Sequence, residues 1–281
     1  MRHHIALRVG PVGFRIGSDW RAPIDALASL YRDYPRAETV DYTVRLEATS
    51  PIRRWVRPSV NIGGDYRLPE AAPLPLAQGL LAAELGMNLQ MALGHRRHLL
   101  LHAAVVAKDD RAILLSGVSG AGKSTMSLML AQQGWRFMGD EFALIDPDTG
   151  LAWPFPRPIS LKNESLAAIA SDSRTGPLLS GTPKGDIRHV APDHHAIANM
   201  ACPATPVLLV FPRFGFPSAS RTLPPAEAFV RLTQASTNYV AMGEAGFRAL
   251  TRLRREVPAI ALDYPDGATG VAAVEALWRA L

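Results

Sequence analysis

The chain has 281 residues, 48% of them hydrophobic, which is enough to bury a sizeable core in one large domain or in a large domain with a smaller one attached. Its net charge of +5 comes from scattered basic residues without a zinc-finger, RRM-like or basic-helix signature, so we expect no nucleic-acid partner. The single cysteine, Cys202, excludes an internal disulfide framework and a metal–cysteine cluster, and we expect it to be a small buried hydrophobe.

The first 74 residues are expected to form a small α+β unit without catalytic chemistry. No charged segment followed by an apolar run opens the chain, and its apolar runs are too short to span a bilayer. We therefore expect a cytoplasmic protein that does not bind a membrane. The expected elements are two strands in residues 5–16, a helix in residues 23–34, and strands in residues 42–46 and 53–60.

A proline-rich connector at residues 68–76 predicts a domain boundary, so we assign residues 1–74 to the N-terminal unit and residues 75–281 to a second domain. Residues 76–93 have the apolar spacing of a long helix. Residues 96–106 then predict a buried strand that turns through residues 108–111 into the next one. His102 lies on that strand, and the hairpin would direct it towards the segment that follows.

That segment is an apolar run, a glycine loop and a helix. Its loop, G-V-S-G-A-G-K-S-T, fits the G-x-x-x-x-G-K-[ST] pattern in which backbone N–H groups surround phosphate oxygens. Lys123 would reach the β- and γ-phosphates, and the Ser124 hydroxyl would reach Mg²⁺. The helix predicted at residues 126–133 adds the positive end of its dipole. The predicted nucleotide-binding residues are Gly117, Val118, Ser119, Gly120, Ala121, Gly122, Lys123, Ser124 and Thr125.

A second strand, at residues 135–145, carries the acids Asp140 and Glu141. Ligands in mononucleotide-binding α/β folds gather at the carboxyl ends of strands. Asp140 is therefore the best candidate either to hold Mg²⁺ or to take a proton from an attacking hydroxyl, and Glu141 is its partner. The sequence alone does not divide Asp140 between these two roles.

Several cations further along the chain are candidates for contacts with phosphate or substrate. The extended, proline-punctuated residues 154–163 carry two of them, and a loop over residues 171–193, expected to be mobile, carries two more. Another follows the buried strand predicted at residues 205–211. The three histidines near residues 189–195 show no repeating ligand pattern, so we expect structural or surface roles for them. The five candidate cations are Arg157, Lys162, Lys184, Arg188 and Arg213.

The rest of the chain predicts helices at residues 226–235, 246–256 and 268–281 and a strand at residues 259–262, followed by Asp263. With the elements before it, this gives an α/β fold class. We expect a P-loop nucleotide-binding core of mixed strands with flanking helices, and a small N-terminal α+β unit beside it.

Three stretches of the sequence resemble the HPr kinase/phosphorylase superfamily: L-L-H-A-A-V-V around His102, the phosphate loop, and R-F-M-G-D-E-F around Asp140. Phosphoenolpyruvate carboxykinase is a more distant resemblance. The likeness is greater to HPr-related kinases of bacterial gene clusters for modified peptides, including those that phosphorylate a C-terminal serine of lasso-peptide precursors. The resemblance implies an HPr kinase/carboxykinase-like core. It leaves phosphorylase activity open, because Glu141 stands where the HPr enzymes have an aspartate.

These observations together predict an ATP- and Mg²⁺-dependent kinase that phosphorylates a serine of a peptide or small protein. In this hypothesis Lys123, Asp140 and His102 serve catalysis, and Ser124, Asp140 and Glu141 hold the metal. One alternative is a kinase of a small metabolite. Another is a nucleotide-binding regulatory module without transferase activity. The sequence leaves open the acceptor, the choice between ATP and GTP, and assembly into homo-oligomers.

Overall fold

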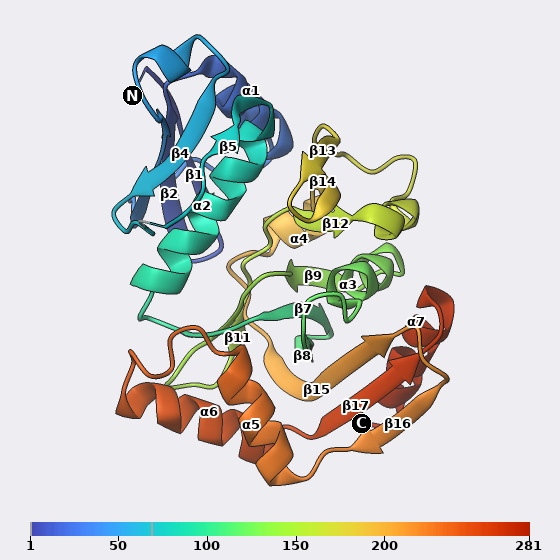
Figure 1. Ribbon diagram of the computed structural model, residues 1–281. Helices are drawn as coiled ribbons and strands as arrows, with labels where there is room; N and C mark the ends of the chain where they lie inside the picture. The colour runs from blue at the N-terminus through green and yellow to red at the C-terminus, as the bar shows by residue number, and fades with distance from the viewer. Residues whose placement is uncertain (1, 69) are drawn as a thin grey trace. The chain divides into compact units, whose positions relative to one another are not determined.

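The computed structural model describes residues 2–68 and 70–281 and is a mixed α/β structure with several sheets (Figure 1). It divides into two compact units. The first unit comprises Met1–His95 and Ser160–Ala191, and the second comprises Arg96–Ile159 and Pro192–Leu281. Each unit is described here by itself.

In the first unit a five-stranded sheet with the order β1-β2-β3-β4-β5 packs against helix α2. The helix lies close to the strands at Gly86, where an added Cβ would come within 2.5 Å of Val44 Cγ1. The elements of Met1–His95 are β1 (His3–Val9), β2 (Val12–Ser18), α1 (Arg21–Leu30), β3 (Tyr42–Ala48), η1 (Ile52–Arg54), β4 (Ser59–Gly64), β5 (Leu74–Pro75), η2 (Leu76–Gln78) and α2 (Gly79–Gly94).

The segment Ser160–Ala191 belongs to this unit because its side chains and backbone contact the N-terminal residues. Leu179 and Ile187 pack against Leu81, and the Gln78 side chain donates to the Gly181 carbonyl at 3.2 Å. The segment contains most of β12 (Ile159–Lys162), then η3 (Asn163–Ala168), β13 (Leu179–Thr182) and β14 (Gly185–Val190), with the sheet order β12-β14-β13.

The second unit is built on a six-stranded mixed sheet with the order β16-β17-β15-β8-β7-β9. Strands β8, β15 and β17 are parallel, whereas β7 runs antiparallel to both β8 and β9. The strands of this unit are β6 (Leu99–Leu101), β7 (Ala103–Lys108), β8 (Arg111–Ser116), β9 (Arg136–Gly139), β10 (Ala143–Ile145), β11 (Ala152–Trp153), β15 (Thr205–Phe214), β16 (Ala219–Thr222) and β17 (Ala259–Tyr264).

Two hydrophobic layers cover the faces of this sheet (Figure 1). Alternate strand residues point to opposite faces, so neighbours such as Leu114 and Leu115 enter different layers. One layer packs against α3 and α7, and the other against α5, α6 and the small sheet β11-β10-β6. The helices are α3 (Lys123–Gln132), α4 (His194–Ala198), α5 (Pro225–Ala235), α6 (Glu244–Glu256) and α7 (Gly267–Arg279).

Several sequence expectations about local structure are wrong. Residues 53–58 do not form a strand: a 3-10 turn and a bend precede β4, which begins only after Pro58. The expected strand at residues 96–106 is interrupted at His102, because β6 pairs with β10 whereas β7 pairs with β8. Residues 171–193 are not a loop throughout, since they contain the β13–β14 hairpin. Cys202 is exposed, because it lies in the turn between α4 and β15.

The compact units also divide at other residues than the expected boundary between residues 74 and 75. Helix α2 packs on β3 and β4, which keeps it in the first unit, and the chain returns to that unit at Ser160. A functional domain that begins at residue 75 stays a prediction.

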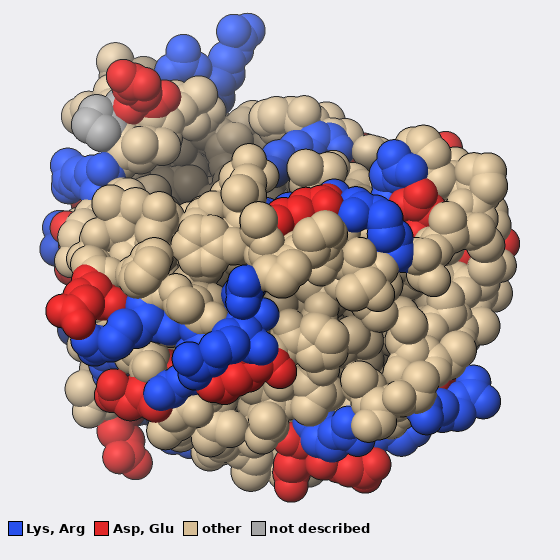
Figure 2. Space-filling model, turned by 90° about the horizontal axis from the view of Figure 1, so that it is seen from below, with Lys and Arg blue, Asp and Glu red and all other residues tan. Residues whose placement is uncertain are grey.

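Acidic and basic side chains are interspersed on the face drawn in Figure 2, and the excess positive charge forms no continuous stripe there. Exposed ion pairs occur in both units, for example Arg21–Asp25 and Arg248–Glu244. Among the described residues, none of the helices combines the length and the apolar character needed to cross a bilayer.

Buried His98 predicts an acid-sensitive second unit. Burial is the main cause that lowers the pKa of His98 from 6.5 to about 4; Asp146 opposes this shift and Arg97 adds to it. The unfolded chain therefore binds a proton below pH 6.5 that the folded chain does not accept until about pH 4. We expect the free energy of unfolding to fall by about 3 kcal/mol across this window.

Urea titrations at pH 7, 5.5 and 4 measure this loss. His98→Gln should flatten the dependence between pH 6.5 and 4. The further loss below pH 3.8, where the lowered pKa of Asp146 contributes, should remain in that variant. An unchanged slope in His98→Gln would contradict the assignment.

Candidate nucleotide site

The glycine loop lies between the end of β8 and the start of α3, as the motif predicts. Gly122 precedes α3 with a φ of 93°, a left-handed conformation that favours glycine. A side chain there would also collide with the last residue of β17, since an added Cβ would lie 2.1 Å from Tyr264 Oη. Both the left-handed backbone and the close approach of Tyr264 therefore require glycine at this position.

The N-terminus of α3 is available to an anion. No side chain caps it and its first turn holds no acid, so its N–H groups and dipole are not satisfied by the protein's own carboxylates. Residues Val118, Ser119 and Gly120 are exposed on the outside of the loop. The residues present thus fit a bound phosphate chain.

Lys123 is held against the loop that it follows. Its Nζ donates to the carbonyl oxygens of Gly117 at 2.7 Å and Val118 at 3.0 Å, and the side chain is buried. Ser124 and Thr125 follow in the first turn of α3 and are partly exposed. The Lys123 ammonium therefore lies against the inside of the glycine loop, and its side chain is buried.

The pairing of the sheet brings His102 and Asp140 to the same edge as the loop. In β7, Ala103 is opposite Ser116 of β8, and Val105 is opposite Gly139 of β9. His102 immediately precedes β7 and Asp140 immediately follows β9. Because β7 is antiparallel to both neighbours, its beginning lies beside their ends.

His102 contacts the second acid of the predicted pair. Its Nδ1 lies 3.2 Å from the Glu141 carbonyl oxygen and 3.7 Å from Glu141 Oε2, which makes an ion pair when the imidazole is protonated. The backbone N–H of His102 donates to the Ala235 carbonyl at the end of α5. This hydrogen bond fixes the backbone at His102, the residue between β6 and β7.

Asp140 and Arg157 are charged side chains that the fold buries. Asp140 is 5% exposed and Arg157 is 4% exposed. The segment that carries Arg157 runs beside β9, since the Phe155 N–H donates to the Met138 carbonyl at 2.6 Å. A Cβ at Gly139 would come within 3.1 Å of the Phe155 carbonyl oxygen, so glycine permits this approach. Buried charges of opposite sign thus lie on two adjacent segments.

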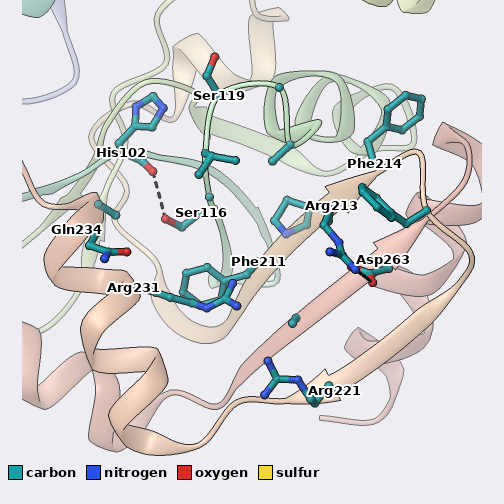
Figure 3. A pocket seen from close by; sticks show the side chains of 18 of the residues that line it. His102, Ser116, Ser119, Phe211, Arg213, Phe214, Arg221, Arg231, Gln234 and Asp263 are labelled. Atoms are coloured by element: carbon teal, nitrogen blue, oxygen red, sulfur yellow. Dashed lines mark hydrogen bonds and ion pairs between the residues drawn. The ribbon is translucent and has the colours of Figure 1, made fainter.

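A pocket of about 1040 Å³ opens below the loop, between α5 and the ends of β15 and β17 (Figure 3). His102 and the outer loop residues line one side of it. Three arginines project from the other elements into the same space: Arg213 from β15, Arg221 from β16 and Arg231 from α5. The pocket is therefore continuous with the phosphate loop and bordered by cations.

Carboxylates fix these arginines. Arg213 donates to both oxygens of Asp263, at 2.9 and 2.5 Å, and these bonds lower the pKa of Asp263. Glu227 accepts from Arg221 at 2.9 Å and from Arg231 at 2.8 Å. Hydrogen bonds from Arg221, then from Arg231, lower the pKa of Glu227 to about 2. The arginine planes are thereby held in set orientations.

Three of the predicted cations belong to the other unit. Lys162, Lys184 and Arg188 lie on or beside β12, β13 and β14. The Asn163 side chain joins this group, because it donates to the Lys184 carbonyl and accepts from the Asp186 N–H. Contacts of these cations with a nucleotide or substrate stay a prediction. His189 is buried in β14, in agreement with a structural role.

Sequence reasoning selected Arg213 but missed Arg221, Arg231 and the aromatic lining of the pocket. Phe214 and Phe216 follow the apolar run of β15, and Arg221 lies on β16, a strand of four exposed residues that was not expected. Tyr264, directly after Asp263, was also missed; its Oη donates to the Ala121 carbonyl of the loop at 3.3 Å. The sequence feature that could have indicated this lining is the aromatic residue at the end of each of the apolar strands β15 and β17.

Neither a protein-family model nor a curated protein matches the sequence. Among solved structures, the chain is similar to the Hpr(Ser) kinase/phosphatase from Coxiella burnetii, with 15% identity and a TM-score of 0.29. The match covers 64% of this chain and 93% of that one. A TM-score this low does not transfer the fold or the activity of that protein, so the function must be inferred from the residues of the site.

Proposed function

We propose that the protein is an ATP-dependent kinase that transfers the γ-phosphoryl group to a serine hydroxyl of a peptide or small protein. The observation that carries the proposal is the ammonium of Lys123, held within a glycine loop at the uncapped start of α3, at the same sheet edge as Asp140. Phosphoryl transfer requires mainly positioning and electrostatic stabilisation from a protein, and these groups supply both.

In the proposed complex the loop amides from Val118 to Lys123 bind the phosphates. Lys123 exchanges its loop carbonyls for phosphate oxygens and neutralises charge on the transferred group. Mg²⁺, when bound, would withdraw charge from the phosphates. Ser124, Asp140 and Glu141 are its proposed protein ligands. Among the residues the structure describes, no group of three or more histidine, cysteine, aspartate or glutamate side chains forms a metal site.

Asp140 has a second proposed role beside metal binding. Asp140 orients the acceptor serine and takes its proton as the new P–O bond forms and the bond to the ADP oxygen breaks. His102 is a positioning residue as much as a catalytic one, because its contacts with Glu141 orient that carboxylate. Arg157, buried beside β9, adds positive charge to this edge. Arg213 lines the pocket, where its ion pair with Asp263 offsets its charge.

The acceptor class is proposed from the sequence resemblance to HPr-related kinases of peptide gene clusters. A peptide natural-product precursor of the lasso type, modified at serine, is therefore the first acceptor to test. Two other functions compete for the same site. One is a kinase that phosphorylates a small hydroxylated metabolite, and the other is a regulatory module that binds the nucleotide without transferring phosphate.

The deciding experiment incubates the purified chain with Mg²⁺, γ-labelled ATP and the precursor peptide encoded nearest its gene. We expect the peptide to gain the mass of one phosphate, on serine, and the label to follow it. A Ser→Ala peptide should take no label, and Lys123→Ala should abolish transfer. Label on a metabolite pool instead would establish the alternative acceptor. ATP binding without transfer to any acceptor would favour the regulatory module.

A further inference from the structure

Two large aromatic side chains are exposed at the turn between β15 and β16. Phe214 is 49% exposed and Phe216 is 43% exposed, and both line the pocket below the phosphate loop. Exposed neighbouring aromatics leave apolar area in water that a flat ligand would cover. None of the roles proposed above for the loop or the acids uses these rings.

The turn is anchored to the loop through Tyr264. The N–H groups of Gly215 and Phe216 both donate to the Tyr264 carbonyl, at 2.9 and 3.4 Å. The Tyr264 ring packs edge-on against Phe214, with centroids 5.8 Å apart, and its hydroxyl donates to the Ala121 carbonyl. Burial raises the pKa of Tyr264, which keeps the hydroxyl protonated as a donor. The aromatic turn and the phosphate loop therefore hold a fixed spacing.

Arg213 completes a flat surface beside the loop. Its guanidinium lies 4.0 Å from the centre of the Phe216 ring, and the two bonds to Asp263 fix its plane. A guanidinium plane and an aromatic ring are both surfaces on which nucleobases stack. Because Asp263 neutralises the charge of Arg213, this surface suits an uncharged aromatic ligand more than a further phosphate.

We propose that Phe216 and Arg213 form the binding surface for the base of the nucleoside triphosphate, a proposal that rests on the ATP-dependent function above. The phosphates extend from the loop amides, and the base stacks on the Phe216–Arg213 pair at the other end of the same pocket. Stacking contributes affinity without reading the identity of the base. This role follows from the shared pocket and from the attachment through Tyr264.

The test compares the binding of Mg·ATP with that of Mg·tripolyphosphate, which has the phosphates but no base. Isothermal titration would be run on the wild type, Phe216→Ala, Phe216→Trp and Phe247→Ala. Phe247 is a matched control, an exposed phenylalanine on α6 of the same unit that does not line the pocket. Phe216→Ala should bind ATP ten- to a hundredfold more weakly and tripolyphosphate within twofold of wild type.

The control Phe247→Ala and the conservative variant Phe216→Trp test whether the loss of ATP binding comes from the aromatic face of Phe216. Phe247→Ala should match wild type for both ligands, and Phe216→Trp should retain ATP binding because it restores a flat aromatic face. Unchanged ATP binding by Phe216→Ala, or an equal loss of both ligands, would overturn the proposal. If the wild type binds neither ligand, the proposed kinase function fails and the base site with it. If it binds both ligands equally, only the base site fails.

Discussion

Asp140→Asn is expected to reduce phosphoryl transfer at least a thousandfold while the protein still binds ATP. The substitution keeps the size of a side chain that is 5% exposed, but removes the negative charge and the proton acceptor. General-base catalysis alone contributes about 10² to 10⁴ in rate, and loss of a metal ligand adds to that. Single-turnover transfer to the acceptor peptide, with nucleotide affinity measured separately, checks the result.

Glu141→Gln is the matched comparison, because the neighbouring acid has the same change in charge on a side chain that is 34% exposed. If Asp140 is the base and Glu141 the metal ligand, extra Mg²⁺ should restore activity to Glu141→Gln and not to Asp140→Asn. The melting temperature of each variant controls for loss of fold, since a buried charged group is being neutralised. An Asp140→Asn enzyme that keeps most of its turnover removes Asp140 from the mechanism.

Lys123→Ala should lose both ATP affinity and transfer. The ammonium makes two hydrogen bonds to loop carbonyls and is buried, so its removal takes away the charge that would meet the phosphates and two contacts that hold the loop. We expect ATP affinity to fall at least tenfold and transfer by about a thousandfold or more, the range for groups that stabilise charge in transfer reactions.

Lys108→Ala provides the control for removal of a lysine. Lys108 is exposed at the turn between β7 and β8, opposite Arg111 in the hairpin, and its Nζ lies 5.6 Å from the centre of the Trp135 ring. Its loss should leave ATP binding and transfer at the wild-type level. Lys123→Arg distinguishes charge from fit: a planar guanidinium keeps the charge but does not reproduce the compact ammonium that donates to both loop carbonyls, so this variant should also be impaired. Wild-type transfer by Lys123→Ala would contradict the proposed chemistry.

Sequence patterns predicted well those helices and strands whose own residues show a clear apolar spacing. The strand before the loop, helices α5, α6 and α7, and the strand that ends at Tyr264 all agree in position to within a few residues. Their apolar spacing follows from the side of each element that faces the core. Where the bounds of a strand depend on which other strands it pairs with, the apolar pattern did not predict them. The apolar run around His102 is continuous in sequence, and its division comes from pairing with two different sheets.

The same distinction applies to the candidate site. The glycine loop and Lys123 follow from their spacing, and Asp140 follows from its place after a strand. The contact between His102 and Glu141 joins positions 39 apart, and its geometry depends on the antiparallel pairing of β7 with its neighbours. The β13–β14 hairpin was missed because its Gly, Ser and Asp content is typical of loops, whereas its stability comes from packing on Leu81.

The sequence by itself determined the conformation of the glycine loop, because a left-handed glycine before a helix and an uncapped N-terminus depend only on neighbouring residues. The tertiary structure decided what surrounds that loop. Tyr264 meets Ala121 across 143 positions, and Phe216 and Arg213 reach the same pocket only because β15 and β17 run parallel to β8. Parallel pairing brings strand ends that are distant in the chain to one edge, and no local pattern in the sequence records which ends will meet.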